Sequence, residues 1–202
     1  MPMDTIKRWA RVTPQKATAN GLSFDSGGTN GMEALNKLYR SYIEDYPKYY
    51  KMDPLSKLGF VASELMLKGD EGRFAEREDR AVILFNKSSS LADDVAFEKT
   101  IMDRSNFFAS PSLFVYTLPN IVTGEIAIRN KYYGETSFIV LPEFNARCIA
   151  EVTVAAFEDP CTESVLGGWL ECESPDIFDA MLFIAPKGIS GETLTKEISS
   201  IH

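Results

Sequence analysis

Few side chains in this sequence belong to the types that carry covalent or metal chemistry. The chain of 202 residues has one histidine, His202, and it is the last residue. Its three cysteines, Cys148, Cys161 and Cys172, are an odd number and do not form a metal-ligand spacing. A thiolate nucleophile assisted by two histidines cannot be built from this chain alone. We expect neither a metal nor a cofactor.

Carboxylates are the remaining candidates for acid-base chemistry. Glu143 follows an apolar run and Pro142, and it precedes residues 145–157, whose apolar side chains recur at helical spacing. A carboxylate at a helix N-terminus is stabilised by the helix dipole by about 0.3–1 kcal/mol. We therefore expect Glu143, with Phe144 and Asn145, to cap this helix. Binding of a specific ligand by Glu143 is the alternative.

Two further carboxylates, Asp53 and Glu151, are candidates for an acid or a base in an enzyme of unrelated chemistry. Asp53 also has a local role, because it precedes Pro54 and a helical stripe of apolar residues and is suited to cap that helix. Nothing in the sequence places any two of these carboxylates together. Cys148 is predicted to be a buried structural thiol, because it lies past the first turn of its helix.

Composition and charge exclude several classes of function. Hydrophobic residues make up 45% and charged residues 25% of the chain, as in ordinary globular domains. The net charge of −8 argues against a nucleic-acid partner, which would need a concentrated basic face. The longest apolar runs are too short for a membrane span, and the N-terminus lacks the layout of a signal peptide. The sequence therefore predicts a reduced cytoplasmic protein.

Alternating strands and helices are predicted along the chain. Strands are expected at residues 6–12, 80–85, 136–141, 164–173 and 180–185, and helices at 54–66, 93–104, 121–130 and 145–157. The strand at 80–85 is apolar throughout, which is typical of burial on both faces. Glycines predict a loop over residues 15–31, and the last dozen residues are a polar tail. This order predicts one α/β domain over residues 1–202, with a layered mixed sheet and helices on both faces.

The stretch from Phe108 to Glu143 has a recognisable order of parts. Leu118-Pro119-Asn120 is followed by Gly124, by Gly134 and by the apolar run 138–141. This order resembles the segment that leads to the nucleophilic cysteine of β-ketoacyl-acyl-carrier-protein synthases, the condensing enzymes of the thiolase-like superfamily. Counted without gaps from Gly124, the cysteine of that family falls on position 143, where this chain has glutamate.

Other segments extend the resemblance over most of the chain, from about residue 13 to residue 185. They are the Thr13-Pro14 turn, Lys51-Met52-Asp53 before a long helix, and the strand containing Gly167-Gly168. The resemblance implies the N-terminal half of the thiolase fold, standing alone and catalytically degenerate. In the family, the second half supplies two catalytic residues that are usually histidines.

The resemblance implies a non-catalytic relative of the condensing enzymes in fatty-acid, polyketide or aryl-polyene-type biosynthesis. Such a protein would act as the partner of an active synthase, or would bind an acyl chain or a carrier protein. Two alternatives stay open: an enzyme half completed by a second polypeptide, and a carboxylate-based enzyme of unrelated chemistry. In the family, some relatives with glutamine at the nucleophile position are decarboxylases or chain-length partners of an active synthase. A glutamate there would mimic an acylated or carboxylated cysteine only loosely.

Partners follow from the same resemblance. A half-fold without its second half should expose an apolar face, so we expect a homodimer or a hetero-complex with a full ketosynthase. The candidate pocket or interface residues are Phe138, Ile139, Val140, Leu141, Pro142 and Phe144, although residues 138–141 would equally suit a central strand. An acyl carrier protein is a further candidate, disfavoured by the acidic charge unless Arg73, Arg77 and Arg80 form a basic patch. A solvated loop of mixed charge is the simpler interpretation of these arginines.

Overall fold

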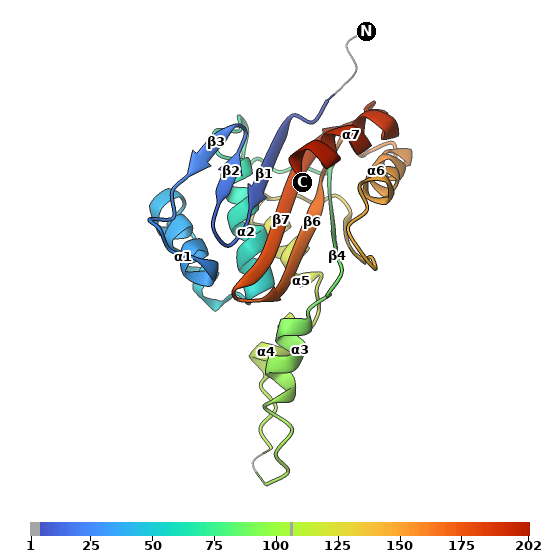
Figure 1. The fold of residues 1–202 in the computed structure, drawn as a ribbon. Helices are drawn as coiled ribbons and strands as arrows, with labels where there is room; N and C mark the ends of the chain where they lie inside the picture. Colours follow the sequence, from blue (N-terminus) through green and yellow to red (C-terminus); the bar gives the residue numbers. More distant parts are fainter. Residues whose placement is uncertain (1–4, 106) are drawn as a thin grey trace.

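The fold is built on one mixed sheet of seven strands (Figure 1). The structure is a computed structural model, and it describes residues 5–105 and 107–202. The strands lie in the order β3-β2-β1-β7-β6-β4-β5. β4 runs parallel to β5 and β6, and the other neighbours are antiparallel. Their bounds are β1 Arg8–Val12, β2 Ala17–Ala19, β3 Leu22–Phe24, β4 Arg80–Asn86, β5 Thr136–Val140, β6 Ser164–Ser174 and β7 Ile177–Pro186.

Helices cover both faces of the sheet, as predicted (Figure 1). One face packs against α1 (Gly31–Tyr42), α2 (Pro54–Met66) and α5 (Ile121–Asn130). The other packs against α6 (Ala146–Ala155) and α7 (Gly191–Ile201). Short 3-10 helices occupy Pro47–Lys51 and Ala156–Glu158.

Strand β4 shows why its sequence is apolar throughout. Val82 and Leu84 belong to the core beneath α2, whereas Ile83 and Phe85 belong to the core beneath α6 and α7. Successive side chains of a strand point to opposite faces, so a strand covered on both sides needs apolar residues at every position. Each fully buried side chain of this size contributes about 1.5–3 kcal/mol.

The predicted loop over residues 15–31 is wrong in part, because β2 and β3 form a hairpin there. Asn20 and Gly21 join the two strands, with φ of 51° and 81°. A two-residue turn with both residues in the left-handed region matches the twist of a hairpin, and Asn-Gly is its favoured sequence. The glycine content indicated a loop, while the Asn-Gly pair was the more specific signal.

The predicted polar tail is also wrong, since residues 191–201 form helix α7. Ser190 caps this helix by accepting a hydrogen bond from the backbone N–H of Thr193. Leu194 and Ile198, one helical turn apart, are buried against the sheet. Two apolar side chains at this spacing are enough to dock an otherwise polar helix.

An arm projects from the body of the domain (Figure 1). We define it as residues 91–118, which contain α3 (Leu91–Glu98) and α4 (Pro111–Tyr116). A helix was predicted over residues 93–104, whereas α3 ends at Glu98 and is shorter than expected. Of the fifteen exposed large hydrophobic side chains in the described residues, eight lie in the arm: Leu91, Val95, Met102, Phe107, Phe108, Phe114, Val115 and Leu118.

Candidate functional site

Glu143 does not cap the helix that follows it. It lies exposed in a bend, and it forms no hydrogen bond or ion pair with any described residue. The cap of α6 is Asn145, whose Oδ1 accepts a hydrogen bond from the backbone N–H of Cys148 at 3.0 Å. The expected capping role of Glu143 is wrong, because Glu143 precedes the capping position by two residues.

Replacing each of the two candidate capping residues in turn should separate their roles. We expect Asn145→Ala to lower the free energy of unfolding by about 1 kcal/mol, because the N–H of Cys148 loses its acceptor. Glu143→Gln should change it by less than about 0.5 kcal/mol, since an exposed side chain without partners contributes little. Urea denaturation of both variants measures the difference. A larger loss for Glu143→Gln would return the capping role to Glu143.

The apolar run before Glu143 forms an edge strand. Among the described residues, β5 pairs with β4 alone and ends the sheet, so β5 is not a central strand of this sheet. Phe138 packs against the core beneath α2, and Ile139 and Leu141 pack against the opposite core. Val140 is half exposed, and Pro142 is exposed. The interface assigned to this run stays a prediction.

Phe144 lies within an aromatic stack beside Glu143. Its ring lies 3.7 Å from the ring of His202 in a stacked arrangement and meets Trp169 edge-on at 5.6 Å. His202 in turn lies 3.3 Å from the carboxylate of Asp179, which also pairs with Arg11. Burial lowers the pKa of His202, with Arg11 as a further cause. The single histidine is therefore brought against Phe144, the residue that follows Glu143, a placement that sequence reasoning missed.

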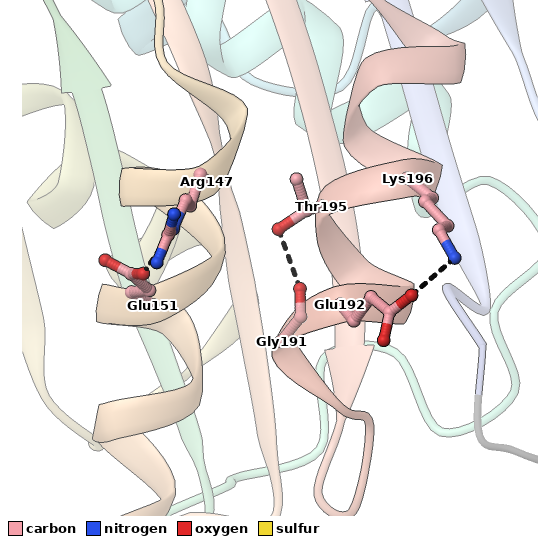
Figure 2. Close-up of a pocket in the computed structure, with 6 residues that line it drawn as sticks. All are labelled: Arg147, Glu151, Gly191, Glu192, Thr195 and Lys196. Atoms are coloured by element: carbon pink, nitrogen blue, oxygen red, sulfur yellow. Dashed lines mark hydrogen bonds and ion pairs between the residues drawn. The ribbon is translucent and has the colours of Figure 1, made fainter.

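The groove between α6 and α7 is lined by polar groups that already have partners (Figure 2). Arg147 pairs with Glu151 at 2.8 Å, and Lys196 pairs with Glu192 at 2.6 Å. The Oγ1 atom of Thr195 donates to the carbonyl of Gly191. Exposed ion pairs of this kind add little to stability, so this groove is a solvated helix surface. Glu151 is therefore a surface residue with an arginine partner.

The three arginines considered for a basic patch are all engaged. Arg73 pairs with Glu64, and Arg77 pairs with Asp79 at 2.9 Å. Arg80 is buried and donates to Ser164 and to the hydroxyl of Tyr132, each at 3.0 Å. Their charges are compensated inside the fold, so they do not form a free basic surface.

The structure joins Asp53 with a carboxylate that sequence reasoning missed. Asp53 caps α2 as predicted, accepting hydrogen bonds from the backbone N–H groups of Leu55 and Ser56 at 2.9 and 3.2 Å. Asp93 of the arm is 4% exposed, and its Oδ2 atom has no hydrogen-bond donor. Burial first, and then the nearby charge of Asp53, raise the pKa of Asp93 to about 8. The two residues are 40 positions apart in the chain, and the sequence gave no signal that they would line the same pocket.

Both aspartates line a pocket of about 360 Å³ at the root of the arm. Tyr116 lines it as well, and burial together with Glu125 and the aspartates raises the pKa of its hydroxyl to about 12. The thiol of Cys172 lies near the same carboxylates, and burial raises its pKa to about 12. Cys172 is buried and Cys148 only half-buried, so Cys172 best fits an inert structural thiol.

Three solved structures share this arrangement of helices and strands. The ishigamide ketosynthase/chain length factor superposes with a TM-score of 0.66 at 16% identity, over 92% of this chain and 62% of that chain. The ketosynthase ApeO in complex with its chain length factor ApeC, from Xenorhabdus doucetiae, gives 0.60 at 12% identity, over 94% and 81%. The third, a type II polyketide synthase acyl-carrier protein in complex with its ketosynthase, gives 0.59 at 12%, over 91% and 62%.

The fold is ketosynthase-like. This confirms the fold expected from the resemblance in the sequence. The chain spans 62% of the length of two of these ketosynthase structures. No protein-family model and no curated protein matches it.

The described residues also bear on metal binding and on membrane spanning. No group of three or more histidine, cysteine, aspartate or glutamate side chains in them is arranged to hold a metal ion. None of their helices combines the length and the apolar character needed to cross a membrane.

Proposed function

We propose that this chain is a non-catalytic ketosynthase-like protein that assembles with an active ketosynthase in fatty-acid, polyketide or aryl-polyene-type biosynthesis. The feature that carries the proposal is Glu143, an exposed carboxylate in a ketosynthase-like fold, which the ungapped count from Gly124 assigns to the nucleophile position. Condensation needs a thiolate to hold the acyl chain and two histidines to act on the charge that develops during decarboxylation. A glutamate and one histidine do not provide these groups.

The arm supports assembly with a partner. Monomeric proteins rarely leave large apolar patches bare, and more than half of the exposed large hydrophobic side chains in the described residues lie in the arm. The outer edge of β5 has no pairing strand among the described residues and offers a second contact. Solved structures with this fold include a ketosynthase bound to its chain length factor and an acyl-carrier protein bound to its ketosynthase.

The alternative of an enzyme half completed by a second polypeptide is less well supported. A missing half would need an apolar surface to pack on, and the outward groove between α6 and α7 carries exposed ion pairs instead (Figure 2). Eight of the fifteen exposed large apolar residues in the described chain lie on the arm, away from this helix layer (Figure 1). A complex of whole proteins through the arm explains this distribution better.

A condensation assay tests whether the chain is non-catalytic. The purified chain is incubated with acyl- and malonyl-carrier protein, alone and together with a ketosynthase from the same organism. We expect no β-ketoacyl product from the chain alone, and a changed rate or product length in the mixture. Product formed by the chain alone, above a no-protein control, would refute the non-catalytic role.

Phe108 tests the arm as the binding surface. Its side chain is 75% exposed, so Phe108→Asp should leave the melting temperature within about 2 °C of the parent. We expect the dissociation constant of the ketosynthase complex to rise at least about tenfold, because a charge would be buried in an apolar interface. Without a ketosynthase, sedimentation should report whether the chain forms a homodimer and whether Phe108→Asp dissolves it.

Ile177→Asp is the matched control for the arm. Ile177 is also exposed, at 58%, and it lies at the β6–β7 turn outside the arm. We expect this variant to bind the ketosynthase like the parent. Equal weakening by both substitutions would mean that added charge, rather than the arm, governs association.

A further inference from the structure

In the Asp53–Asp93 pair, the described residues provide no hydrogen-bond donor to the buried Oδ2 atom of Asp93. Two ionised carboxylates cannot donate hydrogen bonds to each other, so a proton or a cation must lie between them. Asp53 receives two backbone N–H bonds, whereas the Oδ2 atom of Asp93 receives none. A second buried carboxylate oxygen without a donor, Oε2 of Glu125, lies in the same neighbourhood, because Glu125 and both aspartates act on Tyr116.

The pocket that Asp53 and Asp93 line is otherwise largely apolar. Its apolar lining consists of Met52, Pro54, Ala92, Ala96, Leu113 and Pro175. Its volume of about 360 Å³ admits a short alkyl chain. Lys51 also lines the pocket, yet it forms no ion pair with the described residues.

We propose that the pocket at the root of the arm binds an alkyl chain ending in an ammonium or guanidinium group, with the cation held between the carboxylates of Asp53 and Asp93. The apolar lining would cover the methylene groups, and the aspartates would accept hydrogen bonds from the head group. A divalent metal fits less well, because no third ligand of the usual types is arranged beside the pair in the described chain. The same chemistry belongs to a free alkylamine and to a lysine or arginine side chain of a partner protein.

Besides Lys51, which lines the pocket, the other titratable groups around the pair are mostly acidic. Asp94 lies beside Asp93 on α3, Tyr116 on α4, Glu125 on α5, and Glu171 and Cys172 on β6. Lys48 is paired with Glu125 at 2.7 Å, and Lys57 lies near Asp53. The surroundings therefore favour an added positive charge over a further negative one.

Competition with a proton gives the site a measurable signature. Below pH 8 the pair must release its shared proton when the cation enters, because the pKa of Asp93 is about 8. The affinity should therefore rise by about tenfold per pH unit between pH 6 and pH 8, and level off above. Calorimetric titration with n-butylammonium chloride measures it, with n-butanol and sodium chloride at equal concentration as controls.

Three variants decide whether the signal comes from this pocket. Asp93→Asn keeps a hydrogen bond to Asp53 and removes the need for a cation, so binding should weaken at least about tenfold. Asp94→Asn makes the same charge change one residue away on the exposed surface and should bind like the parent. Should Asp93→Asn fail to fold, Ala96→Phe fills the pocket without touching either carboxylate and should also abolish binding.

Several outcomes would overturn the proposal. It fails if n-butylammonium chloride gives no more heat than sodium chloride, or if Asp93→Asn and Asp94→Asn bind the amine equally. It also fails if micromolar magnesium or calcium displaces the amine. The source of the cation is decided separately. If excess n-butylammonium and Asp93→Asn both weaken the ketosynthase complex, the cation is a partner side chain, and if neither does, it is a free amine. Either result supports the assigned chemistry, and the titration does not depend on the proposed function.

Discussion

Gly168→Ala should destabilise the protein by about 4 kcal/mol or more, enough to prevent folding of an ordinary domain. Gly168 lies in β6 with φ of +153°, a backbone conformation that side-chain-bearing residues rarely adopt. A Cβ atom there would lie 2.0 Å from the carbonyl oxygen of Met181 on the paired strand β7. Backbone atoms of two central strands cannot move apart without breaking the ladder between them. Denaturant unfolding, or the soluble yield if the variant does not fold, measures the loss.

Gly124→Ala is the control for this substitution. Gly124 lies inside helix α5, and no atom lies within 4 Å of an added Cβ. Alanine is favoured over glycine in a helix interior, so we expect a gain of about 0.5–1 kcal/mol. A loss of stability in both variants would mean that neither effect comes from the local geometry.

Asp93→Asn should raise stability at alkaline pH by roughly a few kcal/mol and flatten its pH dependence. The folded protein raises the pKa of Asp93 from its ordinary 3.8 to about 8, so the folded state holds a proton that the unfolded state has lost. The contribution of Asp93 is therefore most favourable below pH 4, decreases as pH rises towards 8, and is constant above. Each unit of difference between the two pKa values is worth about 1.4 kcal/mol, and solvent relaxation reduces the total.

Urea titrations between pH 5 and pH 9 measure this prediction. Wild-type stability should fall over the range, whereas Asp93→Asn should not show this component, because its amide donates to Asp53 at every pH. Asp94→Asn, on the exposed side of α3, should retain the wild-type slope. Identical slopes in the wild type and in Asp93→Asn would show that Asp93 is already ionised at neutral pH.

Ionisation of Asp93 should also affect the arm. Asp93 belongs to α3 in the arm, and Asp53 caps α2 in the body. Because the pKa of Asp93 is raised to about 8, this carboxyl keeps its proton at neutral pH and adds no negative charge between the two parts. Loss of that proton places two negative charges across the joint, so the arm should loosen before the body unfolds.

Local sequence signals determined most of the elements. The apolar run of β4, the Asp53-Pro54 start of α2 and the bounds of α5 at residues 121–130 were all predicted, because caps and apolar periodicity act within one or two turns. The hairpin at Asn20-Gly21 and the helix over residues 191–201 have local signals too, and there the composition outweighed them in the prediction. The ketosynthase-like fold was also evident from the order of motifs, as the superpositions confirm.

The chemistry of the site was decided by tertiary structure. Asp53 and Asp93 line one pocket only because the fold brings the start of α3 near the start of α2, and His202 stacks on Phe144 only because α7 folds back onto the sheet. The edge position of β5 likewise depends on the order in which distant strands pair. Contacts between residues far apart in the chain depend on how every layer packs. The sequence could therefore name Asp53 as a helix cap, while the packing alone brought Asp93 to the same pocket.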